Sequence, residues 1–112
     1  MSAGQAADAL ARLAAAVEAR RGADPETSHT ARLLARGPEK AAEKFGEEAV
    51  EAIIEAAKGD RERLIAEGAD VLYHFLVMLA ARDVALADVL AELERREGRS
   101  GVAEKAARGE GR

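Results

Sequence analysis

Acidic side chains recur at helical spacing in two stretches of the chain, and they are the residues best suited to do chemistry. On a helical wheel at ~100° per residue, the first stretch puts four glutamates within an arc of roughly 100°: Glu47, Glu48, Glu51 and Glu55. The second stretch puts three polar residues within an arc of roughly 60°: Glu67, Asp70 and His74. Two lysines lie on the glutamate side, one and two turns earlier: Lys40 and Lys44.

The surroundings of the second group make its charges costly. The run from Gly68 to Ala81 is apolar nearly all round, which is typical of a helix central in a bundle or covered by a subunit. An ionised Asp70 in such a helix must be paired or hold a metal. Two carboxylates ~4 Å apart repel by about 4 kcal/mol at an effective dielectric near 20, and four would exceed the ~5–15 kcal/mol by which a domain is stable. The acidic residues therefore stay splayed in water or are held together by a cation.

The available ligands indicate which cation that is. An oxygen-only set without cysteine favours Mg²⁺, with Mn²⁺ as a possible substitute, over zinc. Because Mg²⁺ keeps waters and shares phosphate oxygens, few protein ligands imply a phosphate-bearing substrate, whose phosphates Lys40 and Lys44 would meet. The sequence contains no Walker loop and no Gly-rich dinucleotide turn. These residues predict metal-assisted hydrolysis of a phosphoanhydride.

Other interpretations of these residues stay open. Taken alone, the glutamate side of the first stretch is also typical of a solvated face with incidental lysine–glutamate pairs. A di-iron bundle would need Glu-x-x-His on two helices, but Glu26 and His29 straddle an expected loop, and Val71 stands three residues before His74. His74 is either a core histidine held by a hydrogen bond, or a partner of Asp70 or a phosphate donor.

Good helix formers dominate the sequence, and glycine and proline breaks divide it into the helices of an all-α domain. We expect helices over residues 6–21, 28–35, 38–58, 61–82 and 86–97. Gly59 should end the third of these, and Asp60 should cap the fourth. In this prediction residues 1–97 form a single domain and residues 98–112 a flexible tail.

The helix over residues 61–82 is apolar on too many sides for one small chain to cover. Short loops make it an antiparallel neighbour of the helix over 38–58, with the acidic arcs facing each other. We therefore predict a four-helix-bundle core completed by homodimerisation. That dimer would bury Phe75, Met78 and Leu79. The alternative is a monomer whose last helix folds back through Leu86, Val89 and Leu93.

Composition excludes several classes of function. The chain has 112 residues, no cysteine and a formal net charge of −4, so disulfides, thiolate metal sites and a generally basic nucleic-acid footprint are excluded. Aromatic residues make up 3%, too few to stack single-stranded nucleic acid. No targeting segment is visible, and the apolar run from Gly68 to Ala81 is expected to be too short for a membrane span. We expect a cytoplasmic protein with no nucleic-acid or membrane partner.

The order of these motifs resembles a known family. Glu48-x-x-Glu51, separated by fifteen residues from Glu67-x-x-Asp70, is similar to the signature of the all-α MazG-type nucleotide pyrophosphohydrolases. Within that superfamily the chain resembles the phosphoribosyl-ATP pyrophosphohydrolases of histidine biosynthesis. Three segments carry this likeness: TSHTARLL (27–34), EKAAEKFGEEAVEAIIEA (39–56) and EGADVLYHFLVMLA (67–80).

The resemblance implies a MazG-like helical bundle that hydrolyses phosphoribosyl-ATP between its α and β phosphates, using Mg²⁺. It makes four residues the metal ligands: Glu48, Glu51, Glu67 and Asp70. The group that takes the proton of the attacking water is one of Glu47, Glu48 and Glu51, with Glu47 otherwise an outer group that orients the water. The substrate-binding residues are expected to be Lys40, Lys44 and His74. A homodimer with active sites near the subunit boundary is implied as well.

Two rival functions remain. A house-cleaning hydrolase of non-standard dNTPs would use the same metal site with a different base and sugar pocket. A non-catalytic helical interaction module would bury its apolar faces against a partner and leave its acidic face to solvent.

Overall fold

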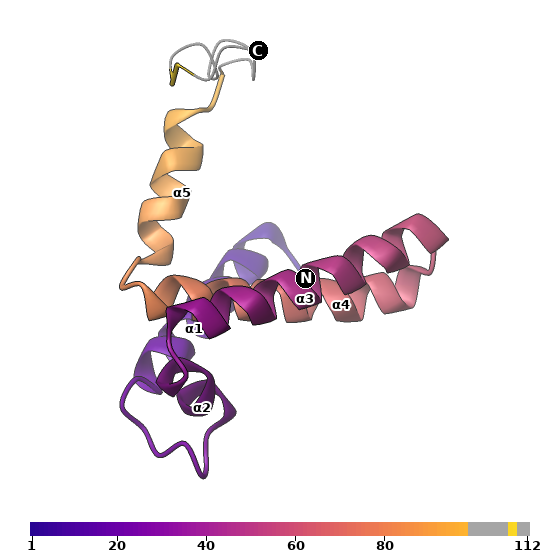
Figure 1. The fold of residues 1–112 in the computed structure, drawn as a ribbon. Helices are drawn as coiled ribbons and strands as arrows, with labels where there is room; N and C mark the ends of the chain where they lie inside the picture. The colour runs from indigo at the N-terminus through magenta and orange to yellow at the C-terminus, as the bar shows by residue number, and fades with distance from the viewer. Residues whose placement is uncertain (99–107, 110–112) are drawn as a thin grey trace.

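Five α-helices joined by short connections make up the computed structural model, which describes residues 1–98 and 108–109 (Figure 1). They are α1 (Ala3–Ala19), α2 (His29–Ala35), α3 (Pro38–Lys58), α4 (Arg61–Ala81) and α5 (Leu86–Arg95). No strand occurs among the described residues, so the all-α prediction is confirmed. The predicted flexible tail lies outside the described residues, apart from residues 98, 108 and 109.

Local signals end and begin the two longest helices where the sequence predicts. Gly59 follows α3 with φ of 78°, a left-handed conformation that costs glycine little because it has no Cβ. Asp60 caps α4, since its Oδ1 accepts a hydrogen bond from the backbone N–H of Arg63 at 3.1 Å. A turn of two residues therefore joins α3 to α4, and the two helices run antiparallel side by side (Figure 1).

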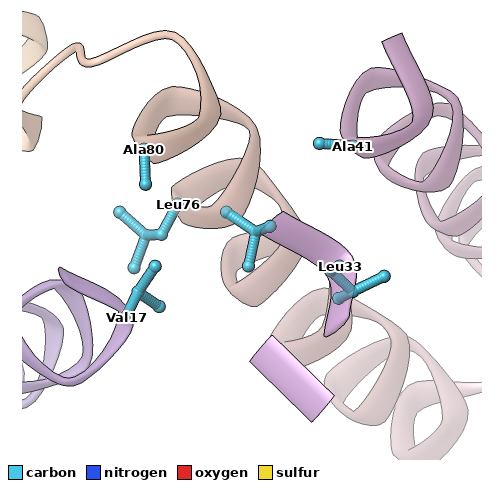
Figure 2. Packing of buried hydrophobic residues seen from close by; sticks show 6 residues of the cluster. Val17, Leu33, Ala41, Leu76 and Ala80 are labelled. Atoms are coloured by element: carbon cyan, nitrogen blue, oxygen red, sulfur yellow. The ribbon is translucent and has the colours of Figure 1, made fainter. Parts of the chain in front are cut away.

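The hydrophobic core lies at the end of this hairpin where α3 begins and α4 finishes. There α1 and α2 pack against α4, and α2 also contacts α3. The buried side chains converge from all four helices (Figure 2): Val17, Leu33, Ala41, Leu76, Val77 and Ala80. Val77, at 1% exposure, is the largest side chain that is fully buried. This small core holds one end of the hairpin rigid and leaves its other end uncovered.

The last helix does not cover α4, so the predicted alternative of a folded-back monomer is wrong. α5 projects from the rest of the chain (Figure 1), and only Leu86 at its start packs against the core. Between α1, the end of α4 and the start of α5 lies an apolar groove of about 440 Å³. None of the acidic residues singled out in α3 and α4 lines this groove.

Much of the apolar surface of the hairpin is exposed. By length and composition the whole of α4 could cross a membrane, whereas the apolar run from Gly68 to Ala81 is only part of this helix. This is weak evidence for a membrane span, because the core helices of soluble proteins have the same length and composition.

Large apolar side chains of the hairpin lie on its surface: Ile53 is 65% and Leu72 50% exposed. Phe75 and Leu79, predicted for a dimer interface, instead already pack against the core of the single chain.

Candidate metal-binding active site

Three carboxylates converge between α3 and α4. Glu48 lies eleven residues before Gly59, and Asp70 lies ten residues after Asp60, so the antiparallel hairpin sets them opposite each other. One oxygen from each of three residues lies within 4.8 Å of the others: Glu48, Glu67 and Asp70. We call these three residues the carboxylate cluster. The predicted meeting of the two acidic arcs is confirmed by this geometry.

Glu51 borders the carboxylate cluster, and its neighbours affect one another's ionisation. Burial raises the pKa of Glu48, and Glu51, Asp70 and Glu67 raise it further. Desolvation raises the pKa of Glu67 in the same way, followed by the charge of Glu51 and a hydrogen bond with it. All four residues predicted as metal ligands therefore lie close together, at an electrostatic cost that a cation would remove.

The donor atoms of the carboxylate cluster suit a hard cation. They are all carboxylate oxygens, the ligands that Mg²⁺ and Mn²⁺ take in proteins. Glu67 Oε2 is buried and finds no hydrogen-bond donor in the described part of the chain. A buried carboxylate oxygen without a donor is costly, and coordination to a metal ion is one way in which that cost is met.

His74 contacts the carboxylate cluster through Glu48. Its Nε2 lies 3.7 Å from Glu48 Oε1, and the residue is only 7% exposed. Burial and then the charge of Lys44 lower its pKa, against smaller opposite effects of Asp70 and Glu47. Nδ1 has no hydrogen-bond partner among the described residues. His74 is buried, as a core histidine would be, and the carboxylate within 4 Å of its ring is Glu48 and not Asp70.

The other predicted site residues lie beside the carboxylate cluster. Lys44 Nζ donates a hydrogen bond to Glu47 Oε1 at 3.3 Å, so Glu47 is turned toward a lysine and is not one of the three converging carboxylates. Lys40 Nζ donates to Glu43 Oε1 at 3.2 Å, one turn closer to the start of α3. Of the two lysines, Lys44 is the one whose charge acts on His74.

A comparison with known proteins gives this geometry a context. The sequence model of the family described as phosphoribosyl-ATP pyrophosphohydrolase matches residues 10–97, a range that holds every residue of the carboxylate cluster. The chain belongs to the phosphoribosyl-ATP pyrophosphohydrolase family. The resemblance seen in the sequence is thereby confirmed.

Individual members of the phosphoribosyl-ATP pyrophosphohydrolase family are similar over nearly their whole length. A phosphoribosyl-ATP pyrophosphatase of Cereibacter sphaeroides is 79% identical over 100 residues, which are 89% of this chain and 97% of the relative. One from Ruegeria pomeroyi is 77% identical over 99 residues, which are 88% and 94% of the two chains. One from Paracoccus denitrificans is 75% identical over 99 residues, covering 88% and 92%.

Two features of this family member were not predicted as parts of the site. Glu55 is 93% buried, being 7% exposed, and it forms ion pairs with Lys58 at 3.5 Å and Arg63 at 3.6 Å. The spacing of Glu55 and Lys58 is a signal for the first pair. The second feature is the ring of His29, which stacks on Tyr73 beside His74, and His29 is too far from Tyr73 in the sequence for this contact to be found by spacing.

Proposed function

We propose that this chain hydrolyses phosphoribosyl-ATP to phosphoribosyl-AMP and pyrophosphate, a step of histidine biosynthesis, and that it works in the cytoplasm. The observation that carries the proposal is the carboxylate cluster, which lies inside the range matched by the family. Close relatives bear the name of this activity. The acidic residues of α4 support a location outside the membrane, because ionised groups are costly there.

The metal in this proposal is Mg²⁺, with Mn²⁺ as a substitute. Its ligands are drawn from four residues: Glu48, Glu51, Glu67 and Asp70. A bound Mg²⁺ neutralises phosphate oxygens, stabilises the leaving pyrophosphate and lowers the pKa of the attacking water. The buried Glu67 Oε2 without a hydrogen-bond donor and the oxygen-only ligand set support this assignment.

The proton of the attacking water goes to a carboxylate in this scheme. Glu48 and Glu51 are the two candidates beside the other acids, whereas Glu47 is hydrogen-bonded to Lys44. Glu47 therefore keeps an outer role, in which it orients Lys44.

The substrate phosphates meet the basic side chains next to the carboxylate cluster. Lys44 is half-buried and its charge reaches His74. His74 is held neutral by its lowered pKa, so one ring N–H remains to donate to a phosphate oxygen. Lys40 is one turn closer to the start of α3 and is assigned to an outer phosphate.

A homodimer completes the protein in this proposal. Large apolar side chains are exposed along the hairpin: Val50, Ile53, Ile54, Leu64, Ile65 and Leu72. Contiguous apolar surface of this kind marks an interaction site. A second copy is the partner that would pair two hairpins into a four-helix bundle. Its interface would use these outward residues, beside the partly buried Phe75, Met78 and Leu79.

The decisive experiment measures pyrophosphate release from phosphoribosyl-ATP by the purified chain, with Mg²⁺ and with a chelator. We expect turnover with Mg²⁺ and loss of turnover with the chelator. A panel of canonical and modified dNTPs runs in parallel, and preferential hydrolysis of a dNTP would replace this function with the house-cleaning one. Absence of any Mg²⁺-dependent stabilisation or hydrolysis would leave only the interaction module.

A further inference from the structure

Three rings connect the start of α2 to the carboxylate cluster. Tyr73 packs edge-on against His74, with ring centroids 5.0 Å apart and planes at 65°. On its other side it lies nearly parallel to His29, with centroids 6.3 Å apart and planes at 19°. A hydrogen bond between the hydroxyls of Thr30 and Tyr73 fixes the tyrosine in this place. The rings thus form a row that begins beside Glu48 and ends at His29.

The outer end of this row is open to solvent. His29 is exposed, whereas Tyr73 is half-buried and His74 is buried. The charges of Lys44 and His29 both lower the pKa of His74, so both basic residues lie near this histidine. The link between α2 and α4 includes the hydrogen bond between Thr30 and Tyr73 and the buried Leu33, so it does not depend on the exposed imidazole alone.

Few other flat side chains are free to bind a base. The whole chain has one tyrosine, two phenylalanines and no tryptophan. The two phenylalanines, Phe45 and Phe75, pack against each other with ring centroids 5.8 Å apart. The other histidine, His74, is buried. An aromatic face for a base is therefore offered by His29 and by Tyr73 behind it.

We propose that His29, backed by Tyr73, stacks on the adenine ring of the nucleotide substrate. This inference rests on the proposed function, because it takes the triphosphate to lie at the carboxylate cluster and Lys44. The base, joined through the ribose, would lie away from the carboxylate cluster, and the row of rings runs from Glu48 outward to the exposed His29. Bases stack on aromatic faces with little sequence preference, so this contact orients the nucleotide while other groups distinguish its substituents.

The test uses AMP as the probe, because it carries the base without a bond to hydrolyse. The chain has only two histidines, so its ring Cε1–H proton resonances can be assigned with one variant, His29→Phe. We expect AMP to shift the His29 resonance upfield through the ring current of adenine. Ribose 5-phosphate has the same anion and no base, and it should not produce this shift.

Variants measure how much the contact contributes. His29→Ala should weaken AMP binding about fivefold or more, the lower end for base–aromatic stacking, whereas His29→Phe should stay within about twofold of the wild type. Thr27→Ala, in the preceding loop, is the matched control and should bind AMP normally. Equal AMP affinity of the wild type and His29→Ala overturns the proposal, as does an equal upfield shift with ribose 5-phosphate.

Hydrolysis of phosphoribosyl-ATP by the wild type is measured on the same samples. If the wild type hydrolyses phosphoribosyl-ATP, but AMP neither shifts the His29 resonance upfield nor binds more weakly to His29→Ala, the stacking subsite alone is overturned. If AMP shifts the His29 resonance upfield but the wild type does not hydrolyse phosphoribosyl-ATP, the proposed function is overturned and an adenine-binding site remains.

Discussion

The two halves of α4 differ both in composition and in surroundings: the C-terminal half is almost entirely apolar, whereas the N-terminal half carries several charged residues. In the C-terminal half, Leu76, Val77 and Ala80 are at most 4% exposed and pack with α1, α2 and α3. In the N-terminal half, Leu64 is 38% and Ile65 58% exposed. The side of that half toward α3 carries Glu67 and Asp70. The C-terminal half of α4 therefore packs in the hydrophobic core, whereas the N-terminal half holds carboxylates of like charge close together.

This contrast shows how a small helical protein can hold a charged site. The packed half fixes where α3 and α4 lie, and the two-residue turn closes the opposite end. These two constraints bring the backbone positions of the carboxylates together. Their mutual repulsion is then relieved by protonation or by a cation.

The largest expected effect concerns the charged half. Asp70→Asn removes one proposed ligand charge and should lower pyrophosphate release at least about 100-fold, since even outer partners of a metal site cost 10–100-fold. The fold should persist, and its stability without metal should be equal or higher because repulsion falls. Thermal melts and steady-state kinetics test both points, with Glu94→Gln on exposed α5 as the control. Near-normal turnover at saturating Mg²⁺ would remove Asp70 from the ligand set.

Substitutions in the packed C-terminal half of α4 should instead lower the stability of the protein. Leu76→Ala should lower the free energy of unfolding by about 2–5 kcal/mol, as large-to-small changes in cores do. Leu93→Ala, on the projecting α5, should cost less than about 1 kcal/mol. Chemical denaturation measures both variants. Similar losses at the two positions would show that α5 is packed in solution.

The two halves also differ in how well the sequence predicts them. Proline, glycine and aspartate signals gave the bounds of α3 and the start of α4, because helix ends depend on neighbours in the sequence. The carboxylate cluster followed from helical spacing and a short turn. By contrast, the bond between Thr30 and Tyr73 joins residues 43 positions apart. The course of α5 and the outward apolar residues depend on packing between elements, which no local pattern specifies.

The exposed apolar side of the hairpin predicts that two copies of the chain associate in solution. The wild type should sediment with a mass near twice 11.8 kDa, because a twofold pair is the simplest way to cover this surface. Ile53→Asp places a charge there and should shift the protein toward the single-chain mass. Ala7→Asp, on the exposed surface of α1, should leave the mass unchanged. A wild type of single-chain mass with full activity would show that the dimer is not needed.

The raised pKa values of Glu48 and Glu67 predict a pH dependence of stability without metal. A carboxyl whose folded pKa lies above its ordinary value of 4.5 contributes stability that is fully present below that value. This contribution is lost as pH rises through the folded pKa. The lowered pKa of His74 acts in the opposite direction, with stability gained as pH rises through its ordinary 6.5.

The comparison must therefore be made between variants. As pH rises from about 5 to 8, a double variant with Glu48→Gln and Glu67→Gln should gain melting temperature relative to the wild type. Mg²⁺ at the upper pH should stabilise the wild type and not the double variant. Parallel curves for the two proteins at all pH values would show that these carboxyls titrate normally.

The smallest expected effect is that of a change at Lys44, which lies in α3 beside the carboxylate cluster. Its side chain is hydrogen-bonded to Glu47 on the surface of α3, and such pairs add about 0.2–1 kcal/mol, so Lys44→Ala should change the melting temperature little. If Lys44 meets a substrate phosphate, the same change should raise KM about fivefold while kcat changes less. Lys40→Ala is the matched comparison, because Lys40 is paired with Glu43 one turn away and should affect KM less. A large loss of stability with unchanged KM in Lys44→Ala would assign the lysine to the packing of the hairpin and not to the phosphate site.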